Sequence, residues 1–66
     1  MTFAIFFDFP ETDTPWFAGW CGNGTLGLAP SLRTAATWDS EEVAERILAT
    51  YGPETRECGV VVELAA

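Results

Sequence analysis

The strongest local signal in the chain is an Asn-Gly pair between two β-favourable segments. Residues 16–21 read Trp-Phe-Ala-Gly-Trp-Cys, and residues 25–28 read Thr-Leu-Gly-Leu. Asn23 and Gly24, which lie between them, supply the two positive-φ residues that a type I′ turn requires. We therefore predict a β-hairpin, and its glycines indicate strong twist, a bulge or the close approach of another backbone.

Two further segments have the pattern of strands. In residues 3–9 the odd positions are Phe, Ile, Phe and Phe, so alternation places a large apolar side chain on one face at every second residue. Pro10 ends this segment, because proline has no N–H to donate to a sheet. Residues 58–64, Cys-Gly-Val-Val-Val-Glu-Leu, are β-branched and apolar enough for a strand in the interior of a sheet.

One amphipathic helix is predicted over residues 39–51. Asp39 is the expected N-cap, with Glu42 completing a capping box, and Ser40 is the alternative cap one residue later. Val, Ala, Ile, Leu and Tyr recur along the segment at helical spacing, and the Gly-Pro pair that follows ends the helix.

The order β-β-β-α-β predicts an α+β fold for residues 1–66 as a single domain. We expect a four-stranded, mostly antiparallel sheet with one helix packed on one face. If the first three strands form a meander, the last runs in the same direction as the first. The expected strand order 4-1-2-3 then requires a parallel pair between them and a right-handed crossover. Residues 31–38 have no clear period, which leaves open whether they contain a short strand.

The composition limits the chemistry available to this fold. The 66 residues include ten acidic side chains, three arginines, no lysine and no histidine, for a net charge of −7. The usual general base, the commonest metal ligand and the amine nucleophile are therefore missing, and a domain this small has little depth for a catalytic site. We expect a non-enzymatic protein without a cofactor or a metal. Direct binding of nucleic acid is disfavoured, because phosphates are bound by basic residues.

The cysteines and the apolar segments bear on the compartment. Cys21 and Cys58 lack the spacing of a zinc site, which leaves either a disulfide or two free thiols. No signal peptide is recognised and no apolar stretch reaches the length that spans a membrane. We expect a cytoplasmic protein, in which free thiols are favoured.

The acidic side chains fall into three groups. They are Asp8, Glu11 and Asp13 around the first loop; Asp39, Glu41, Glu42 and Glu45 at the helix start; and Glu54, Glu57 and Glu63 toward the last strand. The helix-start group also stabilises the helix dipole. In the loop group, Glu11 and Asp13 lie between two prolines and close to Asp8, and the group has no such structural role. Exposed carboxylates on a rigid scaffold suit a basic groove of a protein partner. The candidate contacts are Asp8, Glu11, Asp13, Glu41, Glu42 and Glu45, with Trp16 or Phe17 as an aromatic anchor.

Small size, a net charge of −7, a lone amphipathic helix and the lack of a catalytic set resemble the small phage-encoded anti-CRISPR inhibitors. Several of those resemble nucleic acid electrostatically and bind basic surfaces of the RNA-guided surveillance complex. The resemblance implies an inhibitor that blocks DNA access to such a complex. We expect the protein to be a monomer. It carries over no site residues, because these inhibitors share no fold.

Two alternatives stay open at this point. One is a structural or assembly module that self-associates through an exposed sheet face or edge and is acidic for solubility. The other is a calcium-binding loop formed by Asp8, Glu11 and Asp13, although these residues do not match the EF-hand pattern.

Overall fold

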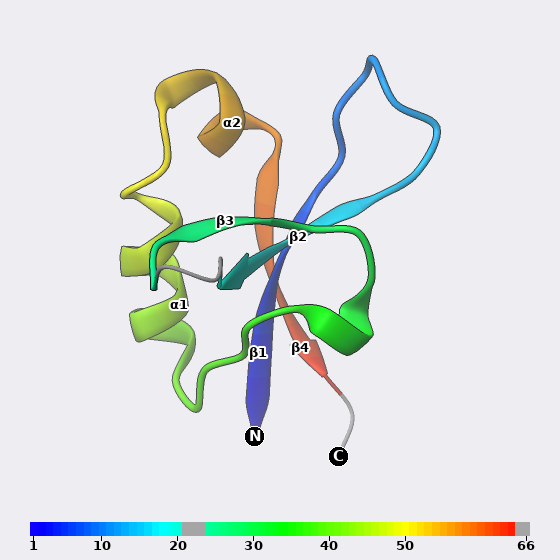
Figure 1. The fold of residues 1–66 in the computed structure, drawn as a ribbon. Coiled ribbons are helices and arrows are strands. Elements are labelled where there is room, and N and C mark those ends of the chain that lie inside the picture. Colours follow the sequence, from blue (N-terminus) through cyan, green and yellow to red (C-terminus); the bar gives the residue numbers. More distant parts are fainter. Residues whose placement is uncertain (21–23, 65–66) are drawn as a thin grey trace.

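The computed structural model describes residues 1–20 and 24–64. Its elements are β1 (Thr2–Phe7), β2 (Trp16–Trp20), β3 (Leu26–Ala29), the 3-10 helix η1 (Leu32–Thr34), α1 (Glu41–Leu48), α2 (Pro53–Glu57) and β4 (Gly59–Leu64). The strands form one antiparallel sheet in the order β3-β2-β1-β4, and α1 packs against β1 and β4 (Figure 1). The predicted α+β class, with four strands and one main helix on the sheet, is confirmed.

The pairing of β4 with β1 is antiparallel, so the predicted parallel pair is wrong. After β3 the chain returns to the start of β1, where Phe3 and Trp38 exchange two backbone hydrogen bonds of 2.8 Å. Helix α1 then carries the chain back along the sheet, and β4 begins opposite Phe7 (Figure 1). The connection therefore makes two passes instead of one, which reverses the direction of β4. Residues 31–38 contain η1 and an isolated bridge at Trp38, not a strand.

Strand β4 lies at an edge of the sheet, although its composition predicts an interior strand. It pairs with β1 along its whole length, from Thr2 opposite Leu64 to Phe7 opposite Gly59. Within the described ranges no strand pairs with its other side. A strand with the residues of a sheet interior is therefore left with one side open.

The hairpin of β2 and β3 is confirmed, but its register differs from that of the predicted turn. A two-residue turn at Asn23 and Gly24 would place Gly27 opposite Trp20, whereas Trp20 pairs with Leu26. Gly24 has φ +84°, the left-handed conformation expected of a turn glycine. Asn23 lies outside the described residues, and so does the predicted type I′ geometry.

The core lies between α1 and the face of the sheet formed by the odd residues of β1. Its buried members are Phe3, Ile5, Phe7, Ala18, Ala44 and Leu48. Phe7 and Ile5 are the largest fully buried side chains. The ring of Phe7 stacks on Phe9 with centroids 5.7 Å apart and lies 5.0 Å from Tyr51. The Tyr51 hydroxyl donates a 2.8 Å hydrogen bond to the Gly27 carbonyl, which ties the segment after α1 to β3.

Helix α1 is capped by Ser40, so the first-choice cap Asp39 is wrong and the alternative is confirmed. The Val43 amide donates to Ser40 Oγ at 3.4 Å, and Ser40 has the extended backbone of an N-cap. Glu41 and Glu42 occupy the first turn, where carboxylates favour the helix dipole. The apolar stripe by which α1 packs on the sheet is narrower than predicted: Ala44 and Leu48 are buried, but Val43 is exposed.

A Ser40→Ala variant is expected to lose about 1 kcal/mol of folding free energy, the usual cost of removing an N-cap side chain. Urea unfolding followed by tryptophan fluorescence measures the loss. Asp39→Ala is the matched control, since Asp39 is the residue next to Ser40 and its carboxylate does not cap α1. A larger loss in the Asp39 variant would contradict the observed cap.

Helix α1 ends at Leu48, with Ala49 as its C-cap, so the end predicted at the Gly52-Pro53 pair is wrong. The pair begins a second helix, α2, which the sequence pattern did not indicate. Pro53 occupies the first position of α2, where its missing N–H costs nothing, and Glu54 lies in the first turn. Across residues 1–20 and 24–64, no helix combines the length and the apolar character needed to cross a membrane.

Candidate partner-binding surface

The acidic side chains lie at the surface and are barely neutralised. All ten are exposed, and no charged side chain is buried in the described part of the chain. The one ion pair among those residues joins Arg46 to Glu42 at 3.0 Å, and both side chains are 75% exposed. Such a pair contributes about 0.5 kcal/mol or less. The molecule therefore presents a surface of nearly uncompensated negative charge.

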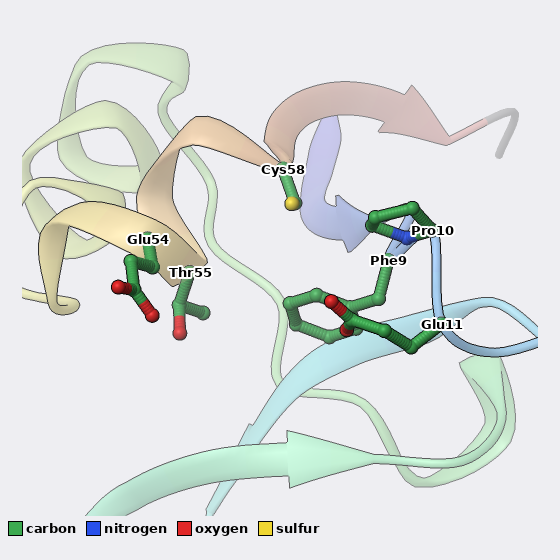
Figure 2. A pocket seen from close by; sticks show the side chains of 6 residues that line it. All are labelled: Phe9, Pro10, Glu11, Glu54, Thr55 and Cys58. Carbon is green, nitrogen blue, oxygen red and sulfur yellow. The ribbon is translucent and has the colours of Figure 1, made fainter.

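Two of the predicted acidic groups meet at a groove between the first loop and α2. The groove has a volume of about 490 Å³ and is lined by Phe9, Pro10, Glu11, Glu54, Thr55 and Cys58. Figure 2 shows Glu54 and Thr55 on one side, Glu11 on the other and Cys58 above them, with the ring of Phe9 between. A carboxylate from each side thus borders one depression.

Backbone hydrogen bonds place the two walls of the groove. The Asp8 amide donates to the Cys58 carbonyl at 3.0 Å, which holds the start of the loop beside the start of β4. Within the loop, the Thr12 amide donates to the Phe9 carbonyl at 3.2 Å and the Thr12 hydroxyl to Thr14 at 3.0 Å. The Cys58 amide donates to Thr55 at 3.1 Å and closes the end of α2. The groove is therefore built on hydrogen-bonded turns.

The chemistry of the groove suits a cationic side chain. Glu11 and Glu54 offer carboxylates, Thr55 offers a hydroxyl, and Phe9 offers an aromatic ring. A guanidinium group binds carboxylates through its fixed N–H donors and stacks on aromatic faces. The arrangement can therefore accept one arginine or lysine side chain of a partner.

The groove contains a thiol but no evident metal centre. Cys58 is a half-buried free thiol, whereas Cys21 lies outside the described residues. The described residues hold no group of three or more His, Cys, Asp or Glu side chains placed to bind a metal ion. Asp8, Glu11 and Asp13 thus do not converge in the way that the calcium alternative requires.

The structure separates the other predicted acidic contacts from the groove. Asp8, Glu11 and Asp13 are exposed beyond the end of β1, whereas α1 begins three residues after Trp38, which forms a bridge with Phe3 at the start of β1. The two ends of β1 are roughly 17 Å apart at the usual rise of a strand. Exposed Glu41, Glu42 and Glu45 therefore belong to a second acidic surface, on α1.

The two predicted aromatic anchors lie on opposite faces of the sheet. Trp16 is half-buried and packs against the core cluster. Phe17 is half-buried beside Phe6, with ring centroids 5.7 Å apart. The most exposed large aromatic in the described residues is Trp20, at 60%. Sequence alternation placed Trp20 on the face of Trp16, so its exposure depends on how far α1 extends over the sheet.

Sequence reasoning also missed that Glu54, Thr55 and Cys58 lie across from Glu11. A signal was present in Pro53 followed by Glu54, which is typical of a helix start.

The comparisons with known proteins add no assignment: no family model matches the chain, and neither a curated protein nor a solved structure shows significant similarity to it.

Proposed function

We propose that this protein is a non-enzymatic inhibitor that acts in the cytoplasm by docking its acidic surface on a basic, nucleic-acid-binding groove of a protein partner. A CRISPR surveillance complex, with its DNA-binding channel blocked, is the partner class we favour. The observation that carries the proposal is the display of ten exposed carboxylates with a single ion pair among the described residues.

The groove between the loop and α2 is the proposed centre of the contact. Carboxylates from two separate elements border it, and its aromatic ring and hydroxyl supply the remaining contacts for a basic side chain. Long-range attraction by the rest of the acidic surface would speed the encounter and make it sensitive to salt. The second acidic surface on α1 would add to this attraction.

The experiment compares two charge-reversal variants with equal net charge. Glu11→Lys/Glu54→Lys alters the groove, and Glu41→Lys/Glu45→Lys alters α1. Each replacement of a glutamate by a lysine raises the net charge by two, so both double variants have a net charge of −3 instead of −7. A partner is first captured from a phage-host lysate, identified, and measured against each variant and against competing DNA. We expect the groove variant to bind at least about tenfold more weakly than the helix variant.

Three results would count against this function or against the groove as the centre of the contact. Capture that neither salt nor DNA displaces would contradict a basic, nucleic-acid-binding partner. Equal weakening by both variants would show that only net charge matters and would remove the groove from the contact. Unchanged binding by both would remove the acidic surface altogether. Thermal unfolding of each variant verifies that it is folded.

A further inference from the structure

We propose that the open edge of β4 is a self-association surface, at which two copies of this chain pair β4 against β4 in an antiparallel, two-fold arrangement. Such a pairing would join two four-stranded sheets into one. The inference is independent of the proposed inhibitor function, because it rests on the backbone of β4 and not on the acidic groove.

The direction of the free backbone groups follows from the hydrogen bonds of β1. Phe3 exchanges both of its backbone hydrogen bonds with Trp38, so its N–H and C=O point away from its β4 partner Glu63. Alternate residues of a strand point their backbone groups to opposite sides, so Ala4 and Phe6 bond to β4. The N–H and C=O groups that face outward from β4 are therefore those of Gly59, Val61 and Glu63.

The edge lacks the features that normally prevent strand pairing. Natural edge strands carry lysine, proline or a bulge that blocks an incoming chain. The segment Gly59–Leu64 contains neither lysine nor proline, and its six residues pair with β1 in unbroken register. One charged side chain, Glu63, is the only protection within the strand.

The sequence of the edge is complementary to itself. With Val61 opposite the same residue of a second copy, Gly59 lies opposite Glu63 and Glu63 opposite Gly59. All three outward-facing residues then meet outward-facing partners, and each such pair exchanges two hydrogen bonds. The carboxylate of Glu63 faces a residue without a side chain, so no like charges are directly opposed. A two-residue shift in either direction leaves part of this edge unpaired.

The second copy also covers apolar surface on the face of the sheet away from α1. Val60 pairs with Phe6 and is 51% exposed, and Val62 beside it is half-buried. In the symmetric register Val60 lies opposite Val62 of the second copy, so each covers the other. Burial of these valines adds a hydrophobic contribution to the backbone hydrogen bonds.

Net charge sets the conditions under which the dimer forms. Two chains of −7 each repel one another, and salt screens that repulsion. Self-association should therefore strengthen as salt rises, whereas docking on a basic partner should weaken. The opposite salt dependences separate this inference from the proposed function.

The first test combines sedimentation equilibrium over a range of salt with amide hydrogen exchange by NMR. We expect a monomer at low salt, a dimer at high salt, and protection of the Val61 and Glu63 amides that appears only in the dimer. A protein that stays monomeric at every salt concentration would overturn the proposal. A dimer in which these two amides exchange as fast as in the monomer would also overturn it.

The second test removes one outward donor. Glu63→Pro deletes an N–H that makes no bond to β1, at an exposed residue, and should weaken self-association at least about tenfold because the two-fold axis repeats the loss. Glu63→Gln keeps the N–H and removes a charge, so its dimer should be as strong or stronger. If both variants self-associated as strongly as the native chain does, the proposed pairing would be contradicted. If the proline variant does not fold, the exchange measurement on the native chain decides.

Discussion

A Phe7→Ala variant is expected to lose most of its folded stability. Phe7 is fully buried, and its ring contacts Phe9 and Tyr51 at the point where β1, the first loop and the segment after α1 meet. Replacing a buried phenylalanine by alanine costs about 3–5 kcal/mol, because the cavity is only partly refilled. A chain of this length has a total stability of about 3–10 kcal/mol.

Urea unfolding, followed by the fluorescence of the tryptophans, measures this loss. Phe6→Ala is the matched control, since it removes the same group from the neighbouring residue on the other face of β1. Phe6 is only half-buried and meets Phe17 edge to face, so its loss should be less than half as large. Equal losses in the two variants would contradict a main hydrophobic cluster on the α1 side of the sheet, where Phe7 lies.

A Gly59→Ala variant is expected to be destabilised by about 1–3 kcal/mol through overpacking. A Cβ atom at this position would lie 2.6 Å from Leu48 Cδ1 and 2.7 Å from Phe7 Cε1, closer than van der Waals contact allows. Either α1 or β4 must then shift outward. Because Leu48 and Phe7 belong to the buried cluster, neither side chain can move without disturbing the rest of the core.

The control and the cause can both be tested with simple substitutions. Gly52→Ala adds the same methyl group where no atom lies within 4 Å, so its stability should stay within about 0.5 kcal/mol of the native chain. Leu48→Val removes the atom nearest to the new Cβ. The stability loss of the double variant Gly59→Ala/Leu48→Val should therefore be smaller than the sum of the losses in the two single variants. Strict additivity would show that the clash with Leu48 is not the cause.

The sequence predicted part of the candidate site, the loop carboxylates, but it did not predict that α2 lies across from them. The loop group of Asp8, Glu11 and Asp13 was predicted as a possible contact, and these residues are exposed beyond the end of β1. Its convergence with Glu54 depends on α2, a helix too short to give a clear periodic pattern. The loop group is also separated from the α1 carboxylates, because the chain returns to the start of β1 before α1 begins. Local sequence patterns do not predict this return.

By itself, the sequence determined which segments form strands and the main helix, and that ten carboxylates are accompanied by only three arginines. The alternating phenylalanines of β1, the hairpin glycines and the apolar stripe of α1 act through contacts between near neighbours along the chain. Tertiary structure alone decided the direction of β4, because the return of residues 31–38 to Phe3 adds a second pass across the sheet. The same arrangement left a strand of interior character at an edge. That placement depends on contacts between residues distant in sequence, which no local pattern encodes.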